Sequence, residues 1–355
     1  MQYIIGAELP NTKIMTRRER VMCAVAGGTP DRVPYCELGI DEPIACQLLG
    51  RSIRQDKVSE AGEYADNPVD VEKDLSRAVG RDNIRYNFCP PIPAEKHVGE
   101  GNILFYGDGQ IKSKSDLDKL VLPDPDDDRL YAPAREFLAK REDFAVCAAC
   151  RLGISPTYLC MGQEFFSLAL YDEPDLVEEV LRRYTEWSAK VMARISTMGF
   201  DLIWTADDIA FKTGLLLSPK MFRERILPHI RKVAEAITIP WIFHSDGNLT
   251  AVLDDIVDLG IAGLHPIEPD AMDIRDIKKR YGKRICLAGN VNVHTLACGS
   301  TEQVEEEVKG LLRDVAPGGG YIMTSGNSLA SYCKVGNIRA MMATLERYGR
   351  YPIEV

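Results

Sequence analysis

The sequence predicts a (β/α)8 TIM barrel with an N-terminal extension and an insertion. From about residue 140 onward, short apolar runs alternate with longer helical patterns, as in a parallel sheet wrapped by helices. About eight such units fit into 355 residues, a size typical of this barrel. A doubly wound sheet would need a Gly-rich turn after its first strand, whereas the Gly run at 318–320 precedes a strand. The barrel is therefore the preferred fold class.

Eight segments are expected to supply the barrel strands. The first begins at Arg32, and the second lies near residues 83–87. The other six have an apolar body, and most of them end in polar residues; they are 144–150, 201–208, 241–247, 263–269, 285–291 and 320–327. Catalytic groups of such barrels lie at the C-terminal ends of the strands, so these polar endings are where a site is expected.

Helical patterns separate the strands. Ser218 can cap a helix that enters at Pro219, because Ser is a favoured N-cap and Pro suits the first helical position. This helix is expected to reach about residue 237. Similar patterns predict helices at 41–49, 174–197, 249–259, 301–315 and 334–348.

The stretch from about 64 to 128 is less regular, and we interpret it as an insertion that also carries one barrel strand. Within it, the Gly-Asp-Gly run at 107–109 separates two β-prone runs and predicts a hairpin turn. The punctuated run at 121–128 predicts a surface connection. The whole chain, 1–355, is expected to form one domain.

Composition excludes several classes of function. With 43 Lys and Arg against 53 Asp and Glu, the net charge is -10, so nucleic acid is not expected as a partner. No run approaches the roughly 20 apolar residues that cross a bilayer, and residues 1–20 lack a signal-peptide core, which predicts a cytoplasmic protein without membrane attachment. The ten cysteines are scattered and are interpreted as reduced. Cys147 and Cys150 form a CxxC, but core packing is preferred to redox or zinc chemistry.

One pair of polar residues has the spacing of metal ligands. His244 and Asp246 are two positions apart, so in a strand they face the same side. A neighbouring strand could add Glu268, and one imidazole with two carboxylates suits Zn²⁺ with an open position for substrate. The alternative is that His244 and Asp246 form a hydrogen-bonded pair that holds a loop.

Other polar residues near strand ends are candidates for catalysis or substrate binding. Asp207 and Asp208 are adjacent, so they point opposite ways and only one can enter the barrel mouth; the other is expected to be structural, for instance as a helix cap. Further candidates are Asn290 for catalysis and, for substrate binding, Gln163, Glu164 and Asn327. His265 is equally well explained as a structural histidine under a loop, and His229 is expected on an outer helix face.

Several motifs give the chain a family resemblance over nearly its whole length. They include MTRRERVMCAVAGGTPDRVPY, MGQEFFSLALYDEPDLVEEVL, FHSDGNL and PGGGYIMTSGNSL. With these motifs the chain resembles the uroporphyrinogen decarboxylase superfamily, which contains the haem-pathway decarboxylase and corrinoid-dependent methyltransferases. The resemblance supports the barrel, but the reaction does not follow from it.

The chain departs from both well-known branches. The decarboxylase clamps its polyanionic substrate with an arginine-rich segment, whereas Ala61-Gly62-Glu63 stands here where Ala-Gly-Arg would be wanted. The thiol methyltransferases bind zinc through a His-x-Cys pair and a Cys on the last strand. Here the pair reads His244-Ser245-Asp246 and the last strand Thr324-Ser325-Gly326-Asn327, so both thiolates are missing.

The resemblance then implies the remaining branch, the first methyltransferase of O-demethylase systems. Imidazole and carboxylate ligands leave the metal a harder Lewis acid than thiolates do, which favours an oxygen substrate. Zn²⁺ on His244, Asp246 and Glu268 would bind the oxygen of a methoxyaromatic ether, whose methyl group passes to cobalt(I) of a separate corrinoid protein. Asp207 or Asp208, with Asn290 and Asn327, would orient the substrate.

Two alternatives stay open at this point. One is a decarboxylase of a smaller carboxylate held by Arg151 or Lys212. The other is a binding protein that has kept the barrel and lost the reaction. The sequence is also compatible with a homodimer, and it does not identify the methyl donor.

Overall fold

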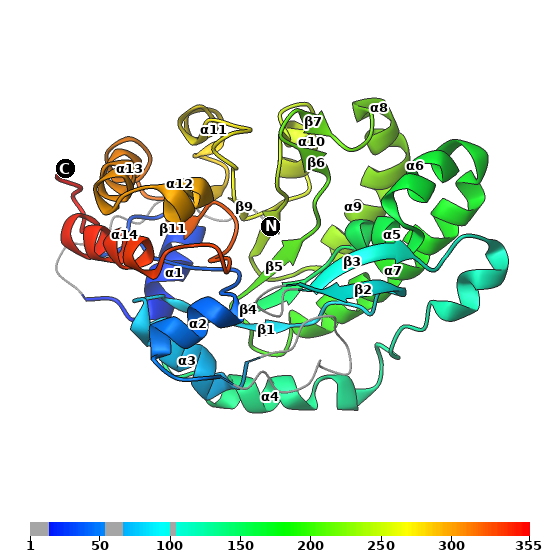
Figure 1. The fold of residues 1–355 in the computed structure, drawn as a ribbon, viewed down its shortest axis with the longest axis horizontal. Coiled ribbons are helices and arrows are strands. Elements are labelled where there is room, and N and C mark those ends of the chain that lie inside the picture. The colour runs from blue at the N-terminus through cyan, green and yellow to red at the C-terminus, as the bar shows by residue number, and fades with distance from the viewer. Residues whose placement is uncertain (1–13, 54–66, 100–103) are drawn as a thin grey trace.

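A parallel sheet that curls into a barrel forms the centre of the molecule (Figure 1). The computed structural model describes residues 14–53, 67–99 and 104–355, so the run Ala61-Gly62-Glu63 lies outside the described residues. Seven strands follow one another in the sheet: β1 (Asn83–Asn87), β4 (Ala145–Cys150), β5 (Leu202–Ala206), β8 (Trp241–His244), β9 (Gly263–His265), β10 (Cys286–Val291) and β11 (Tyr321–Ser325).

The segment around Tyr35 closes the sheet into the predicted barrel. On one side, Tyr35 forms a parallel bridge with Met323 of β11, and the backbone N–H of Cys36 donates to the Met323 carbonyl at 3.0 Å. On the other side, the N–H of Asp82, just before β1, donates to the Tyr35 carbonyl at 2.7 Å. The predicted first strand is therefore present as a bridging segment, since Pro34 has no N–H to extend the ladder.

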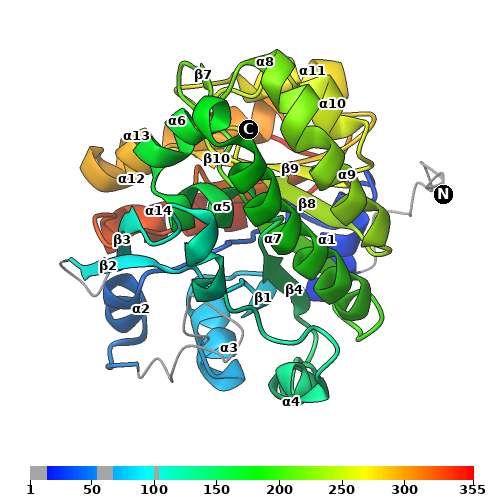
Figure 2. The same cartoon turned by 90° about the vertical axis from the view of Figure 1, so that its right-hand side faces the viewer.

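Helices surround the sheet in both views (Figures 1 and 2). In chain order they are α1 (Arg17–Val25), α2 (Glu42–Leu49), α3 (Val69–Ala78), α4 (Ala132–Ala139), α5 (Ile154–Met161), α6 (Gln163–Asp172), α7 (Pro174–Ile195), α8 (Pro219–Met221), α9 (Leu227–Ala236), α10 (Leu253–Val257), α11 (Ile274–Tyr281), α12 (Val293–Cys298), α13 (Thr301–Asp314) and α14 (Val335–Tyr348). Short 3-10 turns occupy Lys114–Lys119 and Asp128–Leu130. None of the helices in the described ranges combines the length and apolarity that crossing a bilayer requires.

The helix entered at Ser218 begins as predicted and has an unusual middle. The Ser218 side chain accepts the backbone N–H of Met221, and Pro219 is the first helical residue. A five-residue π-helix, Phe222–Ile226, then joins α8 to α9. Such π segments are rare in proteins, and those that occur often lie at functional sites.

Two sequence expectations about local structure are wrong. The Gly-Asp-Gly run is not a turn, because Gly109 ends β3 (Leu104–Gly109) and pairs with Ala94 of the antiparallel β2 (Ala94–Val98). A Cβ on Gly109 would collide with the backbone of Cys160 and Gly162 at the end of α5, so this glycine allows close packing instead. His229 is buried rather than exposed, because its face of α9 packs on α7, where its Nε2 lies 3.0 Å from Glu178 Oε1.

The two cysteines of the CxxC motif are buried in β4 and belong to different apolar clusters. Residues three apart in a strand face opposite sides, so Cys147 points to the cluster that includes Trp204 and Cys150 to the layer under the helices. Burial raises the pKa of the Cys147 thiol to about 12. Both cysteines therefore act as small core residues, in agreement with the sequence interpretation.

Candidate metal centre

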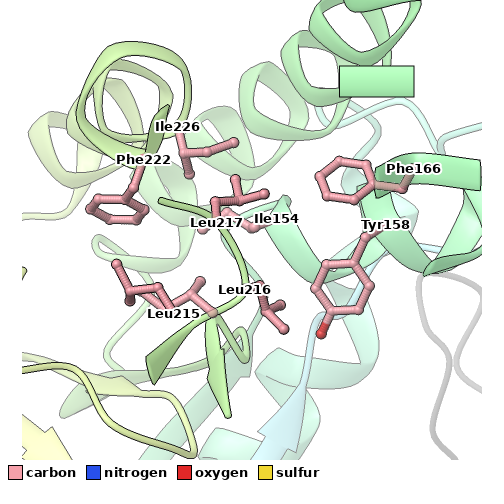
Figure 3. A pocket seen from close by; sticks show the side chains of 9 residues that line it. Ile154, Tyr158, Phe166, Leu215, Leu216, Leu217, Phe222 and Ile226 are labelled. Atoms are coloured by element: carbon pink, nitrogen blue, oxygen red, sulfur yellow. The ribbon is translucent and has the colours of Figure 1, made fainter. Parts of the chain in front are cut away.

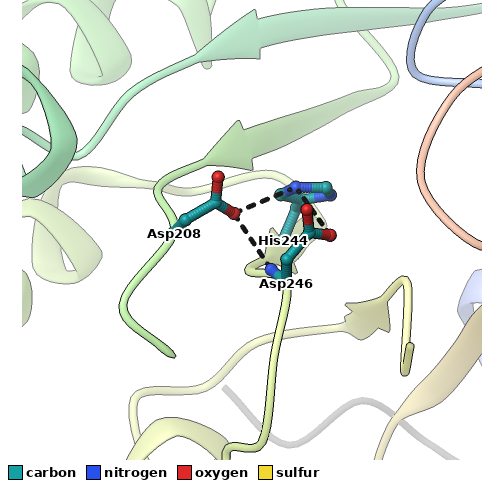
Figure 4. Close-up of side chains that lie close together, drawn as sticks. All are labelled: Asp208, His244 and Asp246. Atoms are coloured by element: carbon teal, nitrogen blue, oxygen red, sulfur yellow. Dashed lines mark hydrogen bonds and ion pairs between the residues drawn. The ribbon is translucent and has the colours of Figure 1, made fainter. Parts of the chain in front are cut away.

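Two neighbouring strands bring three polar side chains to one point at the barrel mouth (Figure 4). In the register of β5 with β8, Ala206 pairs with His244. The chain continues two residues beyond each partner to Asp208 and Asp246, which therefore emerge at the same level. The backbone N–H of Asp246 donates to Asp208 Oδ1 at 3.0 Å and joins the two strand ends.

His244 completes this cluster. Its Nε2 lies 3.4 Å from Asp208 Oδ1 and 3.8 Å from Asp246 Oδ1. One ligand atom from each of the three residues lies within 4.8 Å of the others, and the described residues contain no second group of three His, Cys, Asp or Glu side chains with this proximity. The predicted His244–Asp246 pair thus converges on one point, with Asp208 as third member.

One carboxylate oxygen in the cluster lacks a partner. Asn327 Nδ2 donates to Asp246 Oδ2 at 2.5 Å, but Asp246 Oδ1 is buried and finds no hydrogen-bond donor among the described residues. An unpaired buried acceptor is costly, so a group that satisfies this oxygen would stabilise the site. A cation does this, and one imidazole with two carboxylates is a donor set that fits Zn²⁺.

The neighbours shift the protonation of each member. Burial raises the pKa of Asp246 to about 6, with the charge of Asp208 adding to this effect and that of His244 opposing it. Burial alone would lower the pKa of His244, but its hydrogen bond to Asp208 and the two carboxylate charges raise it. Burial opposes ionisation of Asp208, yet the bond and the charge of His244 hold its pKa below the usual range. At neutral pH both carboxylates are therefore predominantly anionic.

Glu268 lies beside the cluster rather than in it. Its Oε2 accepts the backbone N–H of Gly247 at 3.1 Å, and its Oε1 is 3.5 Å from Lys212 Nζ. Gly247 has φ +84°, and a Cβ there would collide with the Ala210 carbonyl. Glu268 therefore stabilises, through this hydrogen bond, the turn at Gly247 that follows Asp246.

The structure separates the roles of the two adjacent aspartates. Asp207 is fully buried and accepts three hydrogen bonds, from the backbone N–H of Leu152 and from the N–H (2.8 Å) and Oγ (2.9 Å) of Ser155. It thereby caps the N-terminal end of α5 and faces away from the cluster. Only Asp208 enters the mouth, as the alternation of strand side chains requires.

Three other candidate residues lie away from the cluster. Asn290 is buried in β10, where its Nδ2 donates to the Ile267 carbonyl at 2.6 Å. Gln163 and Glu164 are exposed in the first turn of α6. None of the three hydrogen-bonds to Asp208, His244 or Asp246, so their roles stay predictions.

Sequence reasoning missed the direct contact of a second histidine. His265 pairs with His244 in the β8–β9 register, and the two Nδ1 atoms lie 2.6 Å apart. Burial and the nearby charge of His244 lower the pKa of His265 well below its usual value. The signal in the sequence was that WIFH and GLH each end in a histidine. Only the register of the two strands shows that these histidines are neighbours.

A narrow apolar pocket includes Ile209, the residue that follows Asp208 in the chain (Figure 3). Its lining residues come from α5, α6, the loop region 209–217 and the π-helix, and are Ile154, Tyr158, Phe166, Ile209, Leu215, Leu216, Leu217, Phe222 and Ile226. With a volume of about 10 Å³, it has room for about one water molecule. Burial raises the pKa of Tyr158, and the charges of Asp208 and Asp246 add to this effect.

Comparison with known sequences identifies related proteins. The model of the family described as "Uroporphyrinogen decarboxylase (URO-D)" matches residues 16–348. Over 175 residues the chain is 29% identical to "Methylcobamide:CoM methyltransferase MtaA" of Methanosarcina barkeri, covering 49% of this chain and 50% of that protein. Over 244 residues it is 25% identical to the uroporphyrinogen decarboxylase of Alkalilimnicola ehrlichii, covering 65% of each. The chain thus spans about half the length of the methyltransferase relatives that it matches.

Solved structures support the fold. A methyltransferase from Methanosarcina mazei superposes with a TM-score of 0.74 at 20% identity, covering 94% of this chain and 99% of that one. A B12-independent methionine synthase from Shewanella sp. W3-18-1 gives a TM-score of 0.55 at 10% identity, covering 89% and 97%. At these identities the similarity concerns the fold alone, and it confirms the predicted fold class.

Proposed function

Because the chain belongs to the uroporphyrinogen decarboxylase family, we propose that it is a methyltransferase that moves a methyl group from an O-methyl donor to the cobalt(I) of a corrinoid protein. The observation that carries the proposal is the cluster of Asp208, His244 and Asp246 with one unpaired carboxylate oxygen. The relative named a methylcobamide:CoM methyltransferase supports a corrinoid as one partner of the methyl transfer. The lack of thiolate in the cluster supports an oxygen rather than a thiol substrate.

The metal ligands we propose are His244 Nε2, Asp208 Oδ1 and Asp246 Oδ1, with Glu268 supporting the turn that carries Asp246. When bound, Zn²⁺ supplies a Lewis acid that polarises the C–O bond of the ether. Asn327 holds the orientation of Asp246 through its 2.5 Å hydrogen bond to Oδ2, which leaves Oδ1 directed at His244. Holding ligands in place in this way is what outer residues of metal sites do.

The proposed reaction is a methyl transfer with a balanced exchange of bonds. An electron pair of cobalt(I) forms the new cobalt–carbon bond, while the pair of the broken C–O bond stays on the ether oxygen. The donor leaves as a phenolate or alkoxide and takes its proton from solvent. The protein contributes by orienting the ether and excluding water around it.

We expect the apolar part of the methyl donor to bind in the apolar pocket. Its walls carry aliphatic and aromatic side chains, and the Tyr158 hydroxyl is the polar side-chain group among them. A methoxyaromatic ring needs more space than one water molecule, so the proposal requires this pocket to widen when the donor binds. Leu215 ends β7 (Gly214–Leu215), which pairs with β6 (Ala210–Phe211) in a short hairpin outside the barrel sheet, and Leu216 and Leu217 follow this hairpin.

A decarboxylase is less well supported by the same site. A carboxylated substrate needs an available cation, whereas Lys212 Nζ lies 2.8 Å from Asp270 and 3.5 Å from Glu268. Arg151 Nη1 donates to Ser155 Oγ and to the Ala206 carbonyl. The cluster itself presents carboxylates, which repel a carboxylate substrate.

The test is a methyl-transfer assay with zinc-loaded protein, free cob(I)alamin and a panel of methoxybenzenes. We expect methylcobalamin to form with the native chain and the rate to fall at least about 100-fold in His244→Ala. His229→Gln, which changes a buried imidazole on α9, is the matched control and should keep the rate. Folded, zinc-loaded native protein that transfers methyl from no O-methyl donor would refute the proposal.

A further inference from the structure

A second imidazole, that of His265, contacts His244, one of the proposed metal ligands. His265 on β9 is the register partner of His244 on β8, and the ring centroids lie 4.8 Å apart with 30° between the planes. The two Nδ1 atoms are 2.6 Å apart, and both side chains are buried. A contact this short between two ring nitrogens requires a hydrogen bond.

The chemistry of that hydrogen bond restricts the two rings. One Nδ1 must donate and the other must accept, so a single proton lies between them. If His265 donates, the proton of a neutral His244 is on Nε2, where it faces Asp208 and blocks a cation. If His244 donates, its Nε2 lone pair faces Asp208 and Asp246 and is free for a metal. Only the second arrangement makes His244 a ligand.

Packing fixes the acceptor in place. Trp204 of β5 contacts the His265 ring edge to face, with centroids 4.8 Å apart at 84°. His265 itself is fully buried, so water does not compete for its Nδ1. The acceptor nitrogen is therefore held at a set position behind His244.

We propose that His265 is a positioning residue that accepts the Nδ1 proton of His244 and so presents Nε2 of His244 to a divalent cation. The inference rests on the metal site of the proposed function, but not on the methyl donor or the corrinoid. The second nitrogen of a ligating histidine commonly donates its proton to a carboxylate or a carbonyl, and loss of that acceptor weakens metal binding about 10- to 100-fold. Here a neutral imidazole takes that place.

Two substitutions separate positioning from simple packing. His265→Phe keeps a ring of similar volume but has no acceptor, whereas His265→Gln keeps an acceptor oxygen within reach. Zinc affinity, measured by chelator competition, should fall about 10- to 100-fold in His265→Phe and stay within a few-fold of native in His265→Gln. His229→Phe is the matched control and should bind zinc as the native chain does. Equal zinc affinity of native and His265→Phe, or equal losses in His265→Phe and His265→Gln, would overturn the inference.

A measurement on the native chain covers the case in which His265→Phe does not fold. Nitrogen-15 spectra of the five histidines in zinc-loaded protein should show zinc on Nε2 of His244 and a slowly exchanging proton on its Nδ1. Zinc on Nδ1, or a rapidly exchanging Nδ1 proton, would overturn the inference. Native protein that shows the expected spectrum but transfers no methyl group would refute the proposed function alone.

Discussion

Two carboxylates of the barrel wall, Glu37 in the segment that bridges to β11 and Asp246 after β8, differ in how their oxygens are satisfied. Glu37 is fully buried and accepts the backbone N–H (2.8 Å) and Oγ (2.7 Å) of Ser325 as well as the Tyr35 hydroxyl (3.0 Å). Asp246 has Asn327 on one oxygen and no donor on the other among the described residues. A carboxylate whose two oxygens both accept hydrogen bonds from the protein is structural. A carboxylate with one oxygen that has no donor indicates a binding site for a ligand.

Protonation does not distinguish the two residues. Burial raises the pKa of Glu37 to about 7, against the opposing hydrogen bonds of Ser325, and it raises the pKa of Asp246 to about 6. Both would be singled out as functional candidates by their shifted pKa values alone. The hydrogen-bond partners of the two carboxylates assign them different roles.

Replacing each carboxylate by alanine should have the largest effect we expect. One variant should lose zinc affinity and the other should lose stability. Asp246→Ala should lower zinc affinity at least about 1000-fold and change the free energy of unfolding of the metal-free protein by less than about 1 kcal/mol, because one of its oxygens is already unpaired. Glu37→Ala should lower that free energy by about 3–5 kcal/mol, because three donors lose their acceptor, and leave zinc affinity unchanged. Chelator competition and urea unfolding measure the two quantities. Similar stability losses in both variants would contradict the comparison.

Glu37 should also impose a pH dependence on stability. Its folded pKa of about 7 exceeds the ordinary value of 4.5, so the folded state binds the proton more tightly than the unfolded state. This contribution is fully present below about pH 4.5 and is lost as pH rises to about 7, a change of about 3 kcal/mol. The difference in unfolding free energy between the native chain and Glu37→Gln, measured by urea titration from pH 4.5 to 8, should show it. A difference that does not vary with pH would place the pKa of Glu37 near normal.

Zinc binding should respond to pH in the opposite direction. Asp246, with a pKa of about 6, and His244, with a raised pKa, must be deprotonated to act as ligands. Zinc affinity should therefore rise with pH, by about tenfold per unit for each proton displaced below the pKa, and level off above it. Calorimetry in buffers of different ionisation enthalpy would count the protons released. Zinc affinity that is flat between pH 5 and 7 would remove these groups from the ligand set.

The sequence predicted the elements that depend on local pattern. The eight barrel segments, the Ser218 cap and the facing of His244 and Asp246 all follow from period-two alternation, capping preference and turn residues. Three errors or gaps share another cause. The choice of Asp208 over Glu268 in the cluster depends on the register of β5 with β8, the contact of His265 depends on that of β8 with β9, and the burial of His229 depends on helix packing. Register and packing join residues distant in sequence, which periodicity within one element does not reveal.

The seam of the barrel has a consequence for how the chain is made. Tyr35 near one end bridges to Met323 near the other, a sequence separation of 288 residues. During synthesis, β11 must leave the ribosome before the seam can close, so until then the segment around Tyr35 keeps an unpaired edge. Unpaired edges can recruit other strands, and such long-range pairing forms slowly. Newly made chains are therefore most exposed to aggregation just before their last strand emerges.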